Sequence, residues 1–221
     1  MANDIGWGEG ACNNEIGWGI AQEYFSCSGA AEAPVGATLM KTGQTTSYRT
    51  GDDGDLEKGR ETSFTVLASN NPFGNTNRFT DELGGTTYAN NIVIDWSTYN
   101  GTTVNGWYRL ARPTVGTYTW NQAIDNALSF TIGSFTTGWR LANTTEYFSL
   151  FNWANSPVNK LNYAPFSLVG DFWSSTTDAN TTIAAYYVVN STTLHFFTTG
   201  KTAGIKALFV RTFNVSGTTL T

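Results

Sequence analysis

Two amphipathic helical segments followed by a run of short strand-like segments constrain the fold of this chain more than any other feature. In the first segment, Thr119 has the place of an N-cap. The apolar residues behind it recur with helical spacing, and we expect them to form one buried helix face: Trp120, Ala123, Ile124, Ala127 and Leu128. A second helix is expected over 143–151, where Asn143 and Glu146 have the spacing of a capping box.

Strand-like segments lie on both sides of these helices. Residues 78–96 alternate around a Gly-Gly turn, which predicts a strand, a turn and a strand, and 106–111 form another short element. The connection between the helices is Gly138-Trp139-Arg140-Leu141. The last third contains four further strand-like segments, 171–176, 184–189, 194–197 and 207–213. Two helices placed before a terminal antiparallel meander predict the α+β class.

The composition predicts a globular protein with an uncharged polar surface. Charged residues make up only 13% of the chain and aromatic residues 14%, while Thr, Asn and Gly are abundant. A net charge of -5 and a pI near 4.8 argue against nucleic acid as a partner, because phosphate binding needs a basic surface. The sequence contains no apolar run of membrane-spanning length, so no membrane partner is expected.

The residues with catalytic potential do not form a recognisable pattern. His195 is the sole histidine and lies in an apolar segment, and the two cysteines, Cys12 and Cys27, are remote from it in the sequence. Motifs for a serine nucleophile or a phosphate-binding loop are also missing from the sequence. We therefore expect no enzyme activity, no catalytic residue and no cofactor. One alternative stays open, because two carboxylates, for example those of Asp171 and Asp178, could meet in space as the pair of a glycosidase.

Three aspartates, Asp52, Asp53 and Asp55, surround a glycine in a pattern like the start of a calcium-binding loop. The glutamate that an EF-hand loop carries at its last ligand position is missing. We interpret the carboxylates as turn formers, which accept hydrogen bonds from nearby backbone N–H groups, and keep a cation site as the alternative.

A tetrapeptide repeat marks the N-terminus, where Ile5-Gly6-Trp7-Gly8 recurs as Ile16-Gly17-Trp18-Gly19. Two such short units cannot bury a core of their own. Glycines beside each Trp let the backbone approach another surface closely, and large apolar side chains dominate interface energetics. We expect Ile5, Trp7, Ile16 and Trp18 to anchor this segment on another protein or on a second copy of the chain. Packing against its own domain is the alternative.

The predicted organisation has three parts: an extended N-terminal anchoring arm and linker (1–37), a main domain (38–214) and a polar tail (215–221). The N-terminal residues have no features of a secretion signal, so we expect the protein to be made and kept in the cytosol until it is assembled or released. In that reducing compartment Cys12 and Cys27 are expected to be free thiols rather than a disulfide.

The order of the segments in residues 41–213 resembles the Lcl C-terminal domain family, a branch of the C-type-lectin-like fold. The shared marks are the 120–128 helix, Gly138-Trp139-Arg140-Leu141 before the helix with Glu146, Phe172-Trp173-Ser174-Ser175-Thr176, and Leu208-Phe209-Val210-Arg211. The family usually has a proline after Trp-Arg-Leu, and Ala142 replaces it here. The resemblance implies a lectin-like domain of two helices and an antiparallel sheet. We expect Trp139 and Trp173 to lie in its core.

The resemblance also implies a setting, because such domains occur in bacterial surface adhesins and in bacteriophage virion proteins. The Ile-Gly-Trp-Gly segment is similar to N-termini of phage structural proteins, and the lack of a secretion signal favours a virion. The expected protein is a head fibre, capsid decoration or tail adhesin that is assembled in the host cytoplasm. Its expected partners are other virion proteins and its own copies, as a homotrimer. A purely architectural virion subunit and a bacterial surface adhesin remain as alternatives.

In this fold, irregular loops near the last strands carry the binding surface, which here implies residues 152–171, 177–182 and 199–203. The candidate ligand-binding residues in them are Trp153, Asn155, Asn159, Asn162, Tyr163, Asp178 and Asn180. Aromatic rings stack on the apolar faces of sugars and amides match their hydroxyl groups, so a host-surface glycan is the expected ligand. For Trp153 and Tyr163, burial beneath a loop is the alternative.

Overall fold

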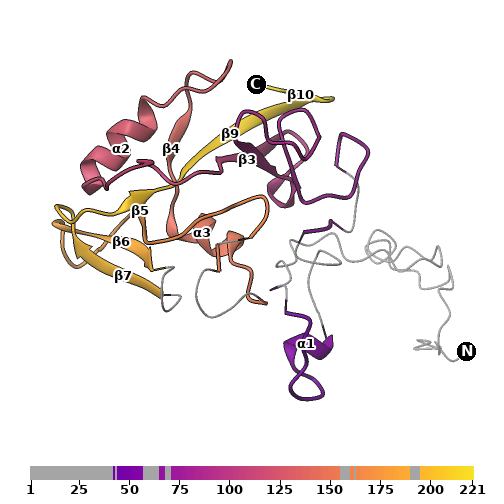
Figure 1. The fold of residues 1–221 in the computed structure, drawn as a ribbon, viewed down its shortest axis with the longest axis horizontal. Helices are drawn as coiled ribbons and strands as arrows, with labels where there is room; N and C mark the ends of the chain where they lie inside the picture. Colours follow the sequence, from indigo (N-terminus) through magenta and orange to yellow (C-terminus); the bar gives the residue numbers. More distant parts are fainter. Residues whose placement is uncertain are drawn as a thin grey trace, which may run out of the picture. The chain divides into compact units, whose positions relative to one another are not determined.

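The computed structural model describes residues 42, 44–56, 65–67, 71–154, 160–161, 163–189 and 195–221 (Figure 1). All of them belong to one compact unit, Leu39–Thr221. The expected anchoring residues Ile5, Trp7, Ile16 and Trp18 lie outside the described residues, as do Cys12 and Cys27. None of the described helices has the length and apolar character needed to cross a bilayer.

The described residues form three α-helices, one 3-10 helix and ten strands. The helices are α1 (Asp53–Leu56), α2 (Trp120–Leu128) and α3 (Thr144–Leu150), and the 3-10 helix η1 is Trp96–Thr98. The strands are β1 (Phe79–Thr80), β2 (Ile92–Asp95), β3 (Thr103–Tyr108), β4 (Trp139–Leu141), β5 (Phe172–Thr177), β6 (Ala184–Val189), β7 (His195–Gly200), β8 (Lys206–Ala207), β9 (Phe209–Ser216) and β10 (Thr219–Leu220). The expected α+β class is confirmed.

The strands form two sheets. The larger has the order β1-β2-β3-β9-β10, with β4 also paired to β9, and the smaller has the order β7-β6-β5-β8. The expected antiparallel meander is confirmed for β5, β6 and β7. The last long strand does not continue it, because β9 pairs with β3 in the other sheet, and β8 runs parallel to β5.

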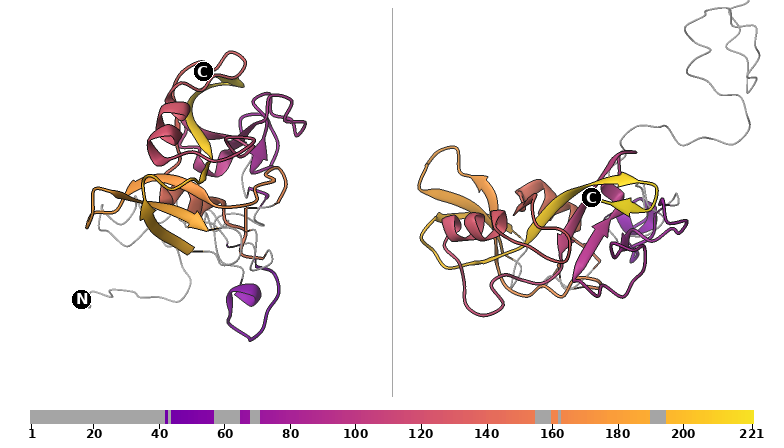
Figure 2. Two further views of the ribbon diagram at one scale, coloured as in Figure 1. Left: turned by 60° about the vertical axis from the view of Figure 1, so that its left-hand side comes forward. Right: turned by 90° about the horizontal axis from the view of Figure 1, so that it is seen from above.

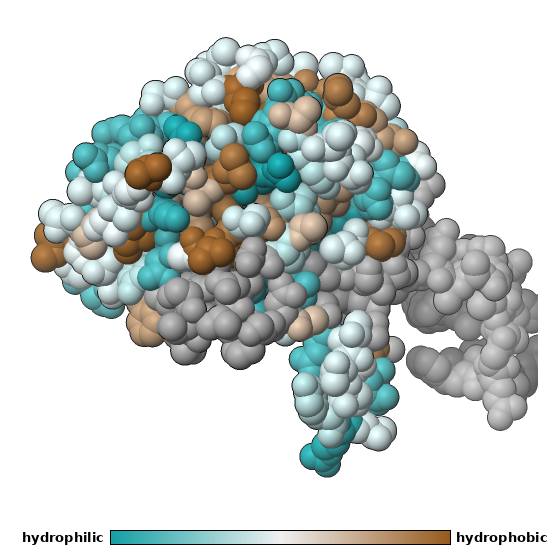
Figure 3. Space-filling model, viewed as in Figure 1, coloured by the Kyte–Doolittle hydropathy of each residue, from teal (hydrophilic) through white to brown (hydrophobic). Residues whose placement is uncertain are grey.

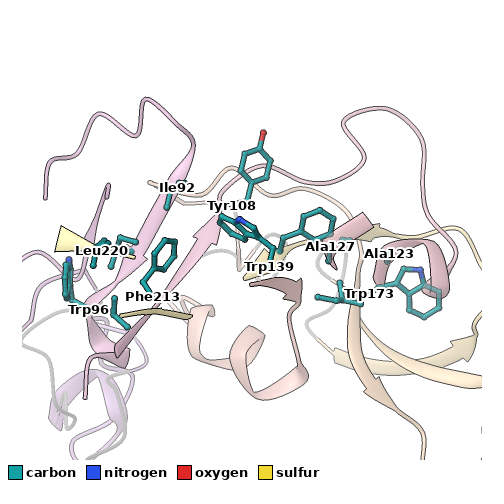
Figure 4. Close-up of a cluster of buried hydrophobic side chains, with 14 of the residues drawn as sticks. Ile92, Trp96, Tyr108, Ala123, Ala127, Trp139, Trp173, Phe213 and Leu220 are labelled. Carbon is teal, nitrogen blue, oxygen red and sulfur yellow. The ribbon is translucent and has the colours of Figure 1, made fainter. Parts of the chain in front are cut away.

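Each sheet has an apolar core on both of its faces. In β2, Ile92 and Ile94 point into one cluster of buried residues and Val93 points into the other, as the alternation of a strand requires. Helix α2 contributes Ala123 and Ala127 to the first cluster, whereas α3 contributes to the second. Figure 4 shows part of the first cluster as a continuous row of side chains. Helix α2 therefore packs on the side of the sheets that forms the first cluster, and α3 packs on the side that forms the second.

Two tryptophans expected in the core are there. Trp139 on β4 is 1% exposed and Trp173 on β5 is fully buried, both in the first cluster. The indole N–H of Trp173 donates to the carbonyl of Tyr118 at 2.9 Å, which ties β5 to the segment that leads into α2. A glycine, Gly106, faces the ring of Phe213, and a Cβ on it would lie 2.4 Å from that ring.

Both predicted helices form, with the expected caps. Thr119 caps α2 in a capping box with Gln122, and Asn143 caps α3 in a capping box with Glu146. The expected burial of Leu128 is wrong, because its side chain is 63% exposed. At about 100° per residue, Leu128 falls at the edge of a stripe whose centre passes through Trp120 and Ala127.

Two segments differ from their expected roles. Residues 139–141 were expected only to join the helices, but they form β4, which pairs with Phe209, Val210 and Arg211 of β9. The segment 215–221, expected to be a polar tail, contains the end of β9 and all of β10. Leu220 is 8% exposed and packs in the first cluster. The sheet therefore extends to the end of the chain, and the separate tail is a correction to the sequence interpretation.

A fully buried ion pair joins β1 to β2. Arg78 Nε and Nη2 donate to the two carboxylate oxygens of Asp95 at 2.9 and 2.8 Å, and both side chains have zero exposure. Asp95 also accepts from the hydroxyl of Ser97 at 2.6 Å. The same Arg78 Nη2 donates to the carbonyl of Ser149 at 2.8 Å, so the pair also holds the C-terminal end of α3.

The face of the described part seen in Figure 3 is mainly polar, with scattered apolar side chains, which are brown. The large apolar residues that are most exposed are Tyr48, Leu56, Leu83, Val115, Leu128, Phe148, Val169, Ile183 and Phe197.

Candidate ligand-binding surface

Three segments that are distant in the sequence meet at the end of the β6–β7 hairpin. The backbone N–H of Lys201, after β7, donates to the carbonyl of Ile183, before β6, at 2.9 Å. The carbonyl of Lys201 accepts from the N–H of Trp120, the first residue of α2, at 2.9 Å. In Figures 1 and 2 the β6–β7 hairpin and α2 lie at the same end of the domain. We call this region, 119–120, 178–183 and 200–203, the tip surface.

The side chain of Lys201 holds the tip surface together. Its ammonium group donates to the carbonyl of Thr182 at 2.8 Å and lies 4.1 Å from the centre of the Trp120 ring. A cation over the face of an indole is attracted by the negative face of the ring. The indole N–H of Trp120 donates to the carbonyl of Ser174 at 2.9 Å, which fixes the ring plane. Trp120 is half-buried, so part of its ring faces solvent.

The loop between β5 and β6 is ordered by its own hydrogen bonds. Asp178 Oδ1 accepts from the N–H of Asn180 at 2.9 Å, which is the arrangement of an Asx turn. The N–H of Asp178 in turn donates to the carbonyl of Ala184 at 3.2 Å. The side chain of Asn180 is exposed, and Asp178 is half-buried. The loop thus presents an amide, a carboxylate and the hydroxyl groups of Thr181 and Thr182 in one place.

The aromatic candidates lie elsewhere. Trp153 is half-buried, with its ring centre 5.8 Å from that of Phe148 and 5.9 Å from that of Phe151. The hydroxyl of Tyr163 donates to the carbonyl of Leu150 at 2.6 Å, and its ring packs 5.8 Å from Phe166. The hydroxyl of Tyr163 is therefore engaged in a structural hydrogen bond, and burial raises its pKa.

The structure does not bring the sequence candidates into one site. Phe151 packs on Phe196 of β7, which pairs with Val188, whereas the tip surface begins where Ala184 pairs with Gly200. These two points are four residues apart along the ladder, or about 13 Å. Trp153 and Tyr163 are thus separated from Asp178 and Asn180. The other candidates, Asn155, Asn159 and Asn162, lie outside the described residues.

The carboxylate pair given as an example from the sequence, Asp171 with Asp178, is also separated. Asp171 precedes the six-residue strand β5 and Asp178 follows it, which places them about 20 Å apart. Glycosidases hold their two carboxyl groups about 5 to 9.5 Å apart. Asp171 and Asp178 therefore cannot serve as the two carboxylates of one glycosidase site in this fold. His195 is the first residue of β7, in the strand that the sequence predicted there.

The turn-forming role of the N-terminal aspartates is confirmed for two of them. The Asp52 carboxylate accepts from the backbone N–H groups of Tyr48, Asp55 and Arg49, and Asp55 accepts from that of Gly51 at 2.7 Å. These bonds, led by the one from Tyr48, lower the pKa of Asp52. Within the described ranges, no group of three or more His, Cys, Asp or Glu is arranged to hold a metal ion.

The pKa of Tyr88, which lies between β1 and β2, gives a test of the buried position of its hydroxyl group beside Asp81. This pKa is raised to about 12 by burial and by the nearby Asp81 carboxylate, from an ordinary value of 10.0. Between these values the unfolded chain has released this proton and the folded chain keeps it, so the free energy of unfolding should fall as the pH rises from 10.0 towards 12. Denaturant titrations across this range should show a shallower decline for Tyr88→Phe. An unchanged slope would contradict the assignment.

Two residues of the tip surface were not recognised as site residues from the sequence. Trp120 was assigned to the buried face of α2 because it follows the helical spacing, and Lys201 stood in an expected turn without a named role. Helical periodicity places a residue on the inner face but does not show which end of that face meets solvent. A single lysine in a turn belongs to no periodic sequence pattern. The role of Lys201 in the tip surface therefore follows only from its contacts with Thr182 and Trp120.

Comparison with known proteins gives no family assignment, because the sequence matches no protein-family model and no curated protein.

Proposed function

We propose that this chain is a bacteriophage virion surface protein whose N-terminal arm anchors it to other virion proteins. Its folded domain then displays a binding surface for a host-surface glycan. The arm residues are Ile5, Trp7, Ile16 and Trp18, and the particle is assembled in the host cytoplasm. A head fibre, a capsid decoration and a tail adhesin all have this organisation.

The tip surface is the observation that carries the binding part of this proposal. It offers the exposed amide of Asn180, several hydroxyl groups, a half-buried carboxylate and the ammonium of Lys201, beside the half-buried Trp120. A sugar offers hydroxyl groups and apolar C–H faces, which match this combination of polar groups and aromatic ring. Hydrogen bonds among the three segments preorganise the surface, which reduces the ordering cost of binding.

The C-type-lectin-like fold belongs to the same proposal. Two capped helices, a terminal meander and a long β9 that returns to pair with β3 support it. In such a domain the loops between the last strands present the ligand site, and the tip surface is built from loops of this kind. Trp153 and Tyr163 are no longer part of the proposed site, because they pack around the end of α3, where Phe151 meets the β6–β7 ladder about 13 Å from the Ala184–Gly200 pair.

The protein acts in this proposal by binding alone, without a catalytic step. Several carboxylates of the domain are engaged in structural roles: Asp95 in the buried ion pair, Asp81 in the turn after β1, and Glu146 in the cap of α3. Incubation of the purified protein with host surface polysaccharide, followed by an assay for reducing ends, tests this point directly. Release of reducing sugar would make the protein an enzyme.

The binding proposal predicts that Asn180→Ala and Lys201→Met weaken glycan binding at least about tenfold, the effect of losing roughly 1.4 kcal/mol of interaction. Asn180 offers an exposed amide, and Lys201 both offers an ammonium and positions the loop. Binding of the full chain to a glycan array, followed by titration of the best ligand, measures the loss. Asn214→Ala is the matched control, because Asn214 is also exposed but lies on β9 in the other sheet.

Two outcomes would redirect the proposal. Equal losses for Asn180→Ala and Asn214→Ala would remove the tip surface as the ligand site. No binding to any glycan by a protein that is present in purified virions would favour the architectural subunit. Absence of the protein from virions, with display on a bacterial surface, would favour the adhesin instead.

A further inference from the structure

The ammonium group of Lys201 covers the aromatic ring that the tip surface offers to a sugar. Its Nζ atom lies 4.1 Å from the centre of the Trp120 ring. Trp120 also packs against the first cluster, and its indole N–H donates to the carbonyl of Ser174 at 2.9 Å, so the ring itself is held in place. A sugar therefore stacks on the covered face only after the ammonium has moved aside.

The side chain of Lys201 can move without disturbing the backbone of the tip surface. The Lys201 N–H donates to the carbonyl of Ile183, and its carbonyl accepts from the N–H of Trp120, each at 2.9 Å. These two bonds fix the backbone, whereas the ammonium is carried on a flexible four-carbon stem. Moving it costs the cation–π contact and the hydrogen bond to Thr182, and leaves the arrangement of the three segments unchanged.

The partners of the Lys201 ammonium in the described part of the chain are neutral. One N–H donates to the carbonyl of Thr182 at 2.8 Å, and the second partner is the ring of Trp120. Among the residues that the structure describes, none places a carboxylate oxygen within ion-pairing distance of Nζ. The Asp178 carboxylate accepts instead from the backbone N–H of Asn180. An anionic ligand therefore meets an ammonium for which these residues offer no competing carboxylate.

We propose that the tip surface binds acidic glycans, and that a ligand carboxylate pairs with Lys201, draws its ammonium away from the Trp120 ring and so uncovers the ring for stacking. This inference rests on the proposed glycan-binding function of the same surface and names its ligand class. A sugar hydroxyl is a neutral acceptor that offers the ammonium little more than water does, whereas a carboxylate adds the attraction of an opposite charge.

An acidic sugar combines the two features that this exchange requires. Its carboxylate replaces the cation–π contact that the ammonium loses, and its apolar C–H face then packs on the uncovered indole. A neutral sugar has the apolar face but no charged group to compensate for the lost contact, so it is the poorer ligand.

Matched pairs of oligosaccharides test the ligand class. The acidic members are oligosaccharides of glucuronic, galacturonic and N-acetylneuraminic acid, and the neutral members are the same chains with their carboxyl groups reduced to alcohols. By calorimetric titration of the full-length protein, we expect at least one acidic member to bind at least about tenfold more tightly than its reduced counterpart. This binding should weaken as the ionic strength rises, because salt screens the charge pair.

Equal affinity within the pairs, or tighter binding of the reduced members, would overturn the inference and leave the proposed glycan function standing. No binding to any acidic member would overturn it as well, and the glycan array then decides whether neutral sugars support that function.

Lys201→Met should reduce the ratio of acidic to reduced affinity at least about tenfold. Lys206→Met is the matched control, because it removes the same charge from another half-buried lysine. Lys206 pairs with Phe172 at the start of β5, whereas the tip surface lies beyond the end of that strand. An equal drop of the ratio in both variants would show that net charge alone is responsible, and would overturn the inference.

Nuclear magnetic resonance tests the movement of the ammonium itself. While Nζ lies over the Trp120 ring, the ring current should shift the ε-methylene protons of Lys201 upfield. Their resonance is assigned by its loss in Lys201→Met, and its upfield position should disappear in Trp120→Leu. Binding of the acidic oligosaccharide should move it downfield in the wild type. A resonance that stays upfield in the complex would overturn the proposed displacement, whatever the affinity.

Discussion

Asp95→Ala is expected to lower the free energy of unfolding by about 3–5 kcal/mol, measured by chemical denaturation. The substitution leaves the Arg78 guanidinium without its carboxylate at a position with zero exposure. A buried cation without a partner loses its hydration and gains nothing in return, which is why breaking such a pair costs more than the pair itself contributes. Folded domains are typically stable by only about 5–15 kcal/mol, so this single change removes a large part of the total.

The partly exposed ion pair between Arg140 and Glu146 provides the control. The side chain of Arg140 is 40% exposed, and Arg140→Met should cost less than about 1 kcal/mol, because the pair is partly solvated and the Glu146 carboxylate keeps its hydrogen bond from the N–H of Asn143. The double variant Arg78→Met with Asp95→Leu should regain much of the loss, since it removes both buried charges. A loss for Asp95→Ala no larger than that for Arg140→Met would show that the buried pair does not have this role.

Trp173→Ala is expected to destabilise the domain by about 3–5 kcal/mol, again by denaturation. Trp173 is fully buried in the first cluster, where its ring packs 6.2 Å from Tyr187. Its removal leaves a cavity between β5 and α2 and frees the carbonyl of Tyr118 from its hydrogen-bond donor. Because Tyr118 directly precedes the cap of α2, we also expect the tip surface to lose order and glycan binding to weaken.

Trp153→Ala compares the same chemical change at a half-buried position. Its ring already faces solvent in part, so its removal should cost clearly less stability and leave glycan binding at the tip surface unchanged. A similar loss at both positions would mean that Trp153 belongs to the core. A selective loss of glycan binding in Trp153→Ala, with stability unchanged, would return it to the ligand site.

The helices could be predicted from the sequence because their signals are local. In a capping box, the N-cap side chain and the side chain three positions later each accept a hydrogen bond from the other's backbone N–H, which needs no distant part of the chain. Asn143 and Glu146 make these two hydrogen bonds, each at 2.9 Å. The burial of α2 was predicted less well, because exposure depends on where the helix ends relative to the sheet. Leu128 follows the apolar spacing and is nevertheless exposed.

The pairing of strands could be predicted only for neighbours in the sequence. The pairing of β1 with β2 was expected from alternation around a Gly-Gly turn, and that of β6 with β7 from the regular spacing of short strands. The pairing of β9 with β3 joins residues about a hundred positions apart, and no local pattern specifies it. The same strand takes β10 as a partner, which is why residues that looked like a polar tail complete the sheet.

The candidate site could likewise be predicted from the sequence only in part. The sequence indicated which loops carry polar groups, and two of the three indicated loops, around Asp178 and Lys201, do meet. It could not show that the loop with Trp153 lies elsewhere, because that separation is set by the length of the β6–β7 ladder.

By itself, then, the sequence determined the α+β class, the two capped helices, most of the strands and the two core tryptophans, since these depend on propensity, spacing and apolar character. The tertiary structure decided which strands pair, that Arg78 and Asp95 share a fully buried position, and that Trp120 and Lys201, rather than Trp153, meet the loop that carries Asp178 and Asn180. Each of these depends on contacts between residues far apart in the chain, and their free energy exists only once the whole domain has folded.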